Sequence, residues 1–576
     1  MNDIIIGIDL GTTNSEVAIV ENGNVSVISD AGKKILPSFV GVDDNNEILV
    51  GETARNQQLI YPERTIKSIK RLMGQNSHVV MAGQHYSPQE ISAIILKRLK
   101  AIAEAHVGQA ISKAVITVPA YFSDAQRQAT REAGEIAGLD VVRMINEPTA
   151  AALVYGAGQD DAKRMLVYDL GGGTFDVSVV NVQSGVVEVL SSHGDNHLGG
   201  DDFDQLIVDH IRDHLRQQPG IEIDEHSKAM ARITRAAEQA KRLLSDEPYV
   251  QIEEEYLLDH QGAPIHLSLE LARSTYEDMI ADHINATMDA THIALKGARM
   301  TASDIDEIIL VGGSTRTPCI RQRLFDEFGF EPHGEVDPDL CVAMGAAMQA
   351  AMINGQNIGT VLVDVTPYTY GTSAIGYLDG QPYPYQYVPI IHKNSVLPTR
   401  KSEAFMTHQD SQREVKVRIF QGEDPDALNN IEIGEFLIED LLDVPAGNII
   451  TLTLDLDLNG ILHVSAREKA SGKEKAITIN NAISRFETEA LSTAKQRIGD
   501  LFGENDDAAA EESAAAIAAR QLIKKAESWL DNVSAEDKED MVDLIEAITD
   551  GLERGDDAGL REAVERLNDI LYYLES

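Results

Sequence analysis

Two related segments, each with an aspartate ahead of a glycine- and threonine-rich turn, carry residue types that bind phosphate. Residues 7–20 (GIDLGTTNSEVAIV) align with residues 167–180 (VYDLGGGTFDVSVV) at a constant offset of 160 positions, so that Asp9 matches Asp169. Each copy is expected to be a strand, a tight turn and a returning strand. Glycines let backbone N–H groups approach phosphate oxygens, threonine hydroxyls add donors, and an aspartate at a strand end can hold hydrated Mg²⁺. Two facing turns therefore predict a clasp around one polyphosphate.

A third strand-to-glycine junction lies in residues 308–316 (IILVGGSTR), and it ends in Arg316, which could lie against a nucleoside. No G-x-x-x-x-G-K-[ST] segment occurs, so the phosphate site is not a Walker loop. One such hairpin alone would be explained equally well as a glycine turn joining two strands. The duplication favours phosphate binding.

Three regions of different texture must position these residues. From the start to about residue 357, short apolar runs alternate with helical segments such as 124–137 and 227–244, which indicates an α/β fold. After residue 366, closely spaced alternating strands (414–420, 449–456, 461–466 and 475–479) predict a compact all-β domain. From about residue 484 the chain is rich in Ala and Glu and reads as helix.

Composition excludes several classes of protein. The chain has 576 residues and a formal net charge of −44, so nucleic acid and anionic membranes are not expected partners. Two cysteines, Cys319 and Cys341, are too few for a disulfide framework and fit a reducing cytosol. The N-terminus does not resemble a signal peptide, and no apolar run reaches the ~20 residues of a membrane span. A soluble cytoplasmic protein is predicted.

Motifs in order along nearly the whole chain resemble those of the DnaK-type seventy-kilodalton heat-shock chaperones. The matching segments are GIDLGTTNS (7–15), SIKRLMG (68–74), VPAYFSDAQRQATREAG (118–134), INEPTAAALVYG (145–156), DLGGGTFDVS (169–178), HLGGDDFD (197–204), VGGSTRTP (311–318), DVTP (364–367) and NGILHVSA (459–466). The resemblance implies an actin-like, two-lobed ATPase domain over residues 1–356, a linker over 357–365, a β-sandwich that binds peptides over 366–483 and an α-helical lid over 484–576. The chain is shorter after Gly74 and after Ser245 than is usual in this family. In these two places it resembles the specialised bacterial branch called HscC.

The resemblance also implies roles for single residues. Asp9 and Asp169 would hold Mg²⁺ through water. Catalytic positions are Lys70, Glu147, Asp169 and Thr174, which would orient the attacking water and stabilise charge on the transferring phosphoryl group. The phosphates and the nucleoside would contact Gly11, Thr12, Thr13, Asn14, Gly171, Gly172, Gly173, Gly199, Gly200, Glu238, Lys241, Arg242, Ser245, Gly312, Gly313, Ser314, Arg316 and Asp339. The expected cofactors are ATP or ADP and Mg²⁺, with K⁺ as a candidate further cation.

Three of these residues have plainer interpretations when taken alone. Lys70 in a basic, helical stretch would be a solvated surface residue, and Glu238 and Lys241, three apart on a helix, would form a surface salt bridge. His193 and His197 have a spacing that suggests a metal site, but no third ligand is evident, so an ordinary loop is favoured.

The linker contains an apolar trio, Val361, Leu362 and Val363, where polar residues are normal, so a docking site for the trio is expected. The plainer alternative is that the trio begins the first strand of the β-domain. Docking and release would make the linker the two-state element that coupling between ATPase and β-domain requires. By resemblance, Pro119 and Arg127 relay the nucleotide state, and Arg143 and Asp364 lie where J-domain co-chaperones act.

In the β-domain, extended client peptides would bind through backbone hydrogen bonds and an apolar pocket. The family pocket maps to Phe405, Val415 and Val417, with Ile375 and His408 at the arch positions where Met and Ala are usual. An extra Tyr- and Pro-rich stretch, residues 377–387, is expected to lengthen a loop near the pocket.

The resulting hypothesis is an ATP-dependent chaperone whose ATPase controls peptide affinity. Its partners would be unfolded client polypeptides and a J-domain co-chaperone, and the need for a nucleotide-exchange factor is left open. A metabolic kinase and an actin-like filament ATPase of the same superfamily remain as rivals, although both leave residues 366–576 unexplained.

Overall fold

The computed structural model describes residues 4–156, 161–217, 226–333, 337–356, 358–479 and 488–503, together with residue 223 and isolated positions after residue 503. The chain divides into two compact units, Met1–Ile498 and Gly499–Ser576, and the fold described below is that of the first unit. Within the predicted lid, α10 (Thr488–Leu501) is helical as expected. The predicted helix or hinge at residues 505–519 and most of the remaining lid lie outside the described residues. Over the described residues, no helix is long and apolar enough to cross a membrane.

The first predicted hairpin lies at the centre of the first sheet. The sheet runs in the order β11-β10-β1-β2-β3, with β4 also paired to β2. Its strands are β1 (Ile5–Leu10), β2 (Asn14–Glu21), β3 (Asn24–Val27), β4 (Leu36–Pro37), β10 (Lys113–Val118) and β11 (Asp140–Asn146). The helices α2 (Pro88–Val107), α3 (Asp124–Ile136) and α9 (Cys341–Ile353) pack against it. Smaller elements of this half are α1 (Glu52–Gln57), η1 (Pro62–Arg64), η2 (Ile69–Leu72), β5 (Val40–Val42), β6 (Ile48–Val50), β7 (Thr65–Ile66), β8 (Val79–Met81) and β9 (Gln84–Tyr86).

The second predicted hairpin occupies the equivalent place in the second sheet, whose order is β17-β12-β13-β14-β18. Its strands are β12 (Lys163–Leu170), β13 (Phe175–Gln183), β14 (Val186–Asp195), β17 (Glu307–Val311) and β18 (Val361–Val363). The accompanying elements are α4 (Glu147–Gly156), α5 (Gly200–Arg216), α6 (Ser227–Leu243), β15 (Tyr249–His260), β16 (Ala263–Ala272), α7 (Arg273–Gly297), η4 (Ala302–Asp304), η5 (Gly313–Arg316) and α8 (Pro318–Phe328). Both hairpin predictions and the α/β prediction are confirmed.

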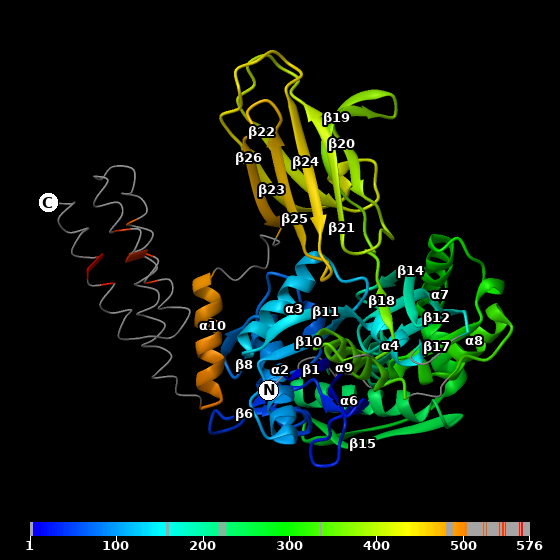
Figure 1. Cartoon of the computed structure of the whole chain (residues 1–576). Helices are drawn as coiled ribbons and strands as arrows, with labels where there is room; N and C mark the ends of the chain where they lie inside the picture. The colour runs from blue at the N-terminus through cyan, green and yellow to red at the C-terminus, as the bar shows by residue number, and fades with distance from the viewer. Residues whose placement is uncertain are drawn as a thin grey trace. The chain divides into compact units, whose positions relative to one another are not determined.

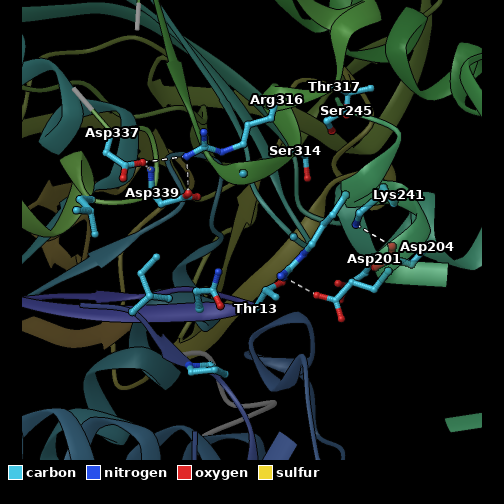
Figure 2. Close-up of a pocket in the computed structure, with 18 of the residues that line it drawn as sticks. Thr13, Asp201, Asp204, Lys241, Ser245, Ser314, Arg316, Thr317, Asp337 and Asp339 are labelled. Carbon is cyan, nitrogen blue, oxygen red and sulfur yellow. Dashed lines mark hydrogen bonds and ion pairs between the residues drawn. The ribbon is translucent and has the colours of Figure 1, made fainter. Parts of the chain in front are cut away.

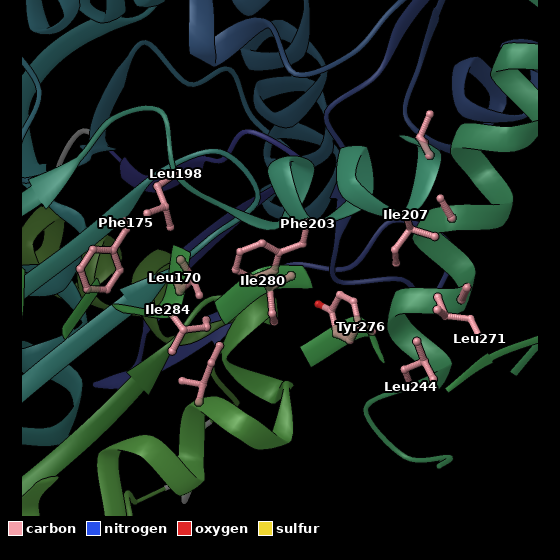
Figure 3. Close-up of a cluster of buried hydrophobic side chains, with 14 of the residues drawn as sticks. Leu170, Phe175, Leu198, Phe203, Ile207, Leu244, Leu271, Tyr276, Ile280 and Ile284 are labelled. Carbon is pink, nitrogen blue, oxygen red and sulfur yellow. The ribbon is translucent and has the colours of Figure 1, made fainter. Parts of the chain in front are cut away.

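The core of this half explains why the second turn is held firmly. Side chains from β12 and β13, such as Leu170 and Phe175, meet Phe203 of α5 and Ile280 of α7, and none is more than 2% exposed (Figure 3). At roughly 25 cal/mol per Å² of buried apolar surface, each such side chain contributes about 1.5–3 kcal/mol. The turn therefore projects from rigid strands.

The predicted all-β domain is two antiparallel four-stranded sheets that share one core (Figure 1). One sheet has the order β20-β19-β22-β23, with β19 (Tyr370–Leu378), β20 (Gln381–Ile391), β22 (Val415–Gln421) and β23 (Ile431–Ile438). The other has the order β21-β24-β25-β26, with β21 (Thr399–Met406), β24 (Ile449–Leu456), β25 (Leu462–Glu468) and β26 (Glu474–Ile479). The short helix η6 (Ala427–Asn429) lies between β22 and β23.

The prediction of a loop over residues 377–387 is wrong. These residues continue β19 and β20 as a hairpin whose turn is Asp379-Gly380, with Tyr377 paired to Pro382 and Gly376 to Tyr383. Asp379 and Gly380 both have positive φ, which is the conformation that a two-residue hairpin turn of the I′ kind requires. Three prolines, at positions 382, 384 and 389, lie on β20, which is an edge strand where missing N–H donors are tolerated.

Candidate functional site

The two repeated turns face each other closely. A Cβ atom added to Gly172, in the second turn, would lie 1.9 Å from Oγ1 of Thr13, in the first turn. Only glycine therefore permits this approach. The Thr13 hydroxyl is buried and has no hydrogen-bond partner among the described residues. A buried hydroxyl without a partner is costly unless a ligand supplies one, so the gap between the turns suits a ligand that offers hydrogen-bond acceptors.

Neighbouring elements fix the second turn. The backbone N–H groups of Gly200 and Asp201, at the N-terminus of α5, donate to the carbonyls of Gly171 and Gly172 at 3.0 and 2.7 Å. The hydroxyl of Ser314 on η5 also donates to the Gly171 carbonyl, at 2.9 Å. These bonds hold the turn in one conformation, which preorganises its N–H groups for an anion.

A buried ion pair lies beside the clasp. Lys70 Nζ is 2.5 Å from Glu147 Oε1, and the two residues are only 4% and 7% exposed. The interpretation of Lys70 as a solvated surface residue is therefore wrong, because η2 carries it inward. Burial lowers the pKa of Lys70, but Glu147 and Asp9 more than offset this, so that the pKa lies above its usual value. Lys70 is a buried, charged ammonium.

The two strand-end aspartates lie in the same small cavity as Lys70. Asp9 Oδ1 accepts a hydrogen bond of 2.7 Å from the Thr117 hydroxyl. Burial and the charge of Glu147 raise the pKa of Asp9 to about 7, and the same two causes raise the pKa of Asp169 well above its usual value. A cation between Asp9 and Asp169 would stabilise both carboxylates in their ionised form. Oxygen ligands of this kind, with room for water, fit Mg²⁺.

A larger cavity of about 980 Å³ adjoins the clasp, and it is big enough for a nucleoside (Figure 2). Its walls include the predicted residues Thr13, Asn14, Gly172, Glu238, Lys241, Arg242, Ser245, Gly313, Ser314, Arg316 and Asp339. The smaller cavity is lined by the predicted residues Asp9, Gly11, Thr12, Thr13, Asn14, Lys70, Glu147, Asp169, Gly171, Gly172, Thr174, Gly312, Gly313 and Asp339. Predicted residues that line neither cavity are Gly173, Gly199 and Gly200.

Ion pairs hold the walls of the larger cavity. Arg316 lies between Asp337 and Asp339, at 3.0 and 2.9 Å (Figure 2). Lys241 pairs with Asp204 at 2.8 Å and donates to the Gly200 carbonyl at 2.7 Å. Lys241 therefore links α6 to the N-terminus of α5, close to the second turn.

The predicted surface pair between Glu238 and Lys241 is not formed. Glu238 instead pairs with Arg55 and Arg242, at 3.1 and 2.6 Å. These two arginines outweigh the effect of burial and lower the pKa of Glu238. Arg55 and Asp204 were missed from the sequence: Asp204 ends the HLGGDDFD motif, whereas no pattern marks Arg55.

The predicted coupling residues meet around Asp364, apart from the cavities. Asp364 is 7% exposed and accepts hydrogen bonds from Asn146 Nδ2 at 3.0 Å and Thr149 Oγ1 at 3.3 Å. Arg127 donates to the Asn146 amide oxygen at 2.7 Å and to the carbonyl of Ala120, next to Pro119, at 3.1 Å. Burial lowers the pKa of Arg143, and the charge of Asp364 partly counters this.

The apolar trio of the linker does not begin the sandwich. Val361, Leu362 and Val363 form β18 and pair in parallel with Val186, Val187 and Glu188 of β14. Leu362 packs against a core cluster of the α/β region. The expected docking site is the edge of the second sheet.

The predicted peptide-binding residues lie on three strands of the sandwich and beyond the end of one. Val417 is 6% exposed and belongs to the core, while Phe405 and Val415 are half-buried against it. Ile375 is 64% exposed, and His408 is exposed just after β21. Ile375, Phe405 and Val415 therefore leave some apolar surface accessible on the sandwich, and His408 is a polar residue beyond the end of β21.

The two histidines have different settings. His193 is on β14 rather than in a loop, so that part of the prediction is wrong, whereas His197 lies after the strand. Over the residues that the structure describes, no group of three or more His, Cys, Asp or Glu could hold a metal by itself. The His193 ring makes an edge contact with the ring of Tyr121, with centroids 4.9 Å apart.

Comparison with known proteins gives matches along nearly the whole chain. The family model described as Hsp70 protein matches residues 5–575. The chaperone protein DnaK of Thermotoga petrophila is 44% identical over 571 residues, which cover 96% of this chain and 94% of the relative. The DnaK proteins of Thermotoga sp. strain RQ2 and Thermotoga maritima match with the same identity and coverage.

Proposed function

The chain belongs to the Hsp70 family, and from this premise we propose how its parts work as an ATP-dependent chaperone. The family gives the chain an ATPase activity and the binding of unfolded polypeptides. The observation that supports the proposed site most strongly is the pair of facing turns beside the buried Lys70–Glu147 pair. The direct test is titration of the full chain with ATP and ADP, together with ATP turnover. Absence of nucleotide binding would refute the proposed site.

In the proposed mechanism, the two turns would orient the β- and γ-phosphates, and Asp9 and Asp169 would hold Mg²⁺ through water. When bound, Mg²⁺ supplies positive charge at the phosphate oxygens. Lys70 places a second positive charge beside the transferring phosphoryl group. Glu147 keeps Lys70 in position and, with Thr174, orients the attacking water. Such a reaction passes through a loose transition state, so positioning and charge are the main contributions that these residues make.

The adenosine would occupy the larger cavity, between α6 and the η5 segment. Glu238, Lys241, Arg242 and Ser245 form one wall, and Gly313, Ser314, Arg316 and Asp339 form the other. Arg316, oriented by two carboxylates, offers a planar guanidinium face for the base.

Coupling would run from the nucleotide to the sandwich through β18 and the polar network of Asp364. J-domain co-chaperones would act at Arg143 and Asp364. The four-part division at residues 356, 365 and 483, the reducing cytoplasmic location and the HscC-like branch stay predictions. A metabolic kinase or a filament protein is not favoured, because the family match extends through the sandwich and into the C-terminal region.

Val415 is proposed as the centre of the client pocket, and replacing it tests that proposal. Val415→Phe is expected to weaken binding of an extended apolar peptide by about 5- to 150-fold, because an added ring in a packed site costs about 1–3 kcal/mol. Basal ATP turnover should stay unchanged. Peptide affinity can be measured by fluorescence anisotropy.

Lys416→Gln is the matched control, because Lys416 is exposed on the same strand. Equal peptide affinity in the wild-type protein and Val415→Phe would place the pocket elsewhere.

A second prediction concerns pH and the contact around His193. The Tyr368 hydroxyl donates to the Tyr121 carbonyl, and Lys393 Nζ lies 3.3 Å from His193 Nδ1. These contacts join the α/β region to the start of the sandwich and to the segment after β20. Burial and the charge of Lys393 lower the pKa of His193 to about 4, and Asp195 opposes them.

After separation, the pKa of His193 should return to about 6.5. The separated state then binds more protons than the docked state between pH 6.5 and pH 4, so docking weakens as the pH falls through this window. Between neutral pH and pH 5.5, the ratio of docked to separated protein should fall about tenfold. The rate of proteolysis in the linker would measure the separated population. His193→Gln should remove this pH dependence, whereas His78→Gln, at an exposed position, should retain it. Equal pH dependence in wild type and His193→Gln would contradict the prediction.

A further inference from the structure

Glu16 is a buried carboxylate that the mechanism above does not use. It lies on β2, directly opposite Asp9 of β1 in the antiparallel pair. Opposite residues of neighbouring strands project from the same face, with Cβ atoms about 5 Å apart. Glu16 is 2% exposed and lines the small cavity together with Asp9 and Asp169. Its side chain is therefore directed at the proposed phosphate site.

The carboxylate of Glu16 has no hydrogen-bond or ion-pair partner within the part of the chain that the structure describes. Its neighbours differ in this respect, since Asp9 is bonded to Thr117 and Glu147 to Lys70. The equivalent residue of the second repeat, Asp176, accepts from the backbone N–H groups of Ala120 and Tyr121 at 3.1 and 3.0 Å. A buried carboxylate without such partners costs several kcal/mol unless a positive charge joins it.

The charges of the cavity point the same way. Five carboxylates line the small cavity, and one of them, Asp339, pairs with Arg316. The other four, Asp9, Glu16, Glu147 and Asp169, face a single ammonium, that of Lys70, so these five groups carry a net charge of −3 when fully ionised. One divalent cation would leave −1 before any phosphate arrives. A nucleotide adds about three to four further negative charges, and at short range in a buried site such repulsion is strong. A second cation would relieve it.

We propose that Glu16 and Asp9 bind a second divalent cation when nucleotide is present, in addition to the Mg²⁺ between Asp9 and Asp169. Asp9 would be shared, with Glu16 on one side and Asp169 on the other. Among the described residues, no group of three His, Cys, Asp or Glu could hold a metal ion alone. Phosphate and water oxygens would therefore complete the coordination of the second cation. The inference rests on the proposed nucleotide site, which supplies those oxygens.

The test counts Mn²⁺ ions per bound ADP in the full chain, by electron paramagnetic resonance with parallel calorimetry of ADP. Wild-type protein is expected to bind two Mn²⁺ per ADP, and Glu16→Gln only one, with ADP still bound. Glu21→Gln is the control, because Glu21 lies at the exposed end of the same strand, and it should bind two. Thermal unfolding would confirm that each variant is folded.

Glu16→Asp keeps the charge on a shorter side chain and is expected to bind the second Mn²⁺ at least tenfold more weakly, whereas Glu16→Gln does not bind it. One Mn²⁺ per ADP in the wild-type protein, or two in Glu16→Gln, would overturn the inference. Failure of the wild-type chain to bind ADP at all would instead refute the nucleotide site, so the two failures are distinguishable.

Discussion

Lys70→Ala is expected to reduce ATP hydrolysis by about 100- to 1,000-fold while ATP still binds. Removing one preorganised charge from a transition state typically costs that much in rate. Lys70 is buried against Glu147, so water cannot replace its charge in the same position. The nucleoside contacts lie in the adjoining cavity and stay intact. Single-turnover hydrolysis and ATP titration measure the two properties separately.

Lys67→Ala provides the control, because Lys67 is exposed three residues earlier on the same segment. Its turnover should match that of the wild-type protein. An unchanged rate in Lys70→Ala would remove the catalytic role of Lys70, and loss of ATP binding would show that Lys70 acts mainly on binding.

Asp364→Asn is expected to abolish the stimulation of ATP hydrolysis by peptide or by a J-domain protein, with basal hydrolysis retained. The substitution removes the charge that faces Arg127 and Arg143, while an amide of the same size still fills the space. Coupling between sites is typically worth about 1–3 kcal/mol, so the stimulation that is lost should be about 5- to 150-fold. Steady-state turnover with and without peptide measures it.

Asp278→Asn, at an exposed position on α7, serves as the matched control and should keep full stimulation. Stimulation that persists in Asp364→Asn would mean that the linker network does not carry the coupling.

The repeated turns could be predicted from sequence because strand ends, glycines and their spacing are local features. The offset between the copies identifies both hairpins, and the structure places them where two central strands end. The docking of the linker was predictable for a related reason, because Leu362 would otherwise face water, although Val361 stays 60% exposed in the docked strand.

Other features depend on packing between distant segments, and the local residue pattern did not reveal them, although the family resemblance placed Lys70 and Glu147 in one catalytic site. Nothing near Lys70 shows that η2 turns it toward Glu147, which is 77 residues further along the chain. Likewise, Arg55 meets Glu238 across 183 positions. The extended hairpin at residues 377–387 was read as a loop because its tyrosines and prolines lack alternation, although edge strands tolerate both.

The pairing of β18 with β14 makes the linker a ligand that the chain supplies to itself. Its first backbone bond, from the Val361 N–H to the Gly185 carbonyl at 2.8 Å, begins a strand addition of the kind by which many domains capture free peptides. A tethered segment reaches an effective concentration on the order of millimolar, so a free peptide of the same sequence would have to approach that concentration to compete. Any factor that releases the segment therefore also exposes an unpaired sheet edge, and rapid recapture by its own tether is what keeps that edge from pairing with a second molecule.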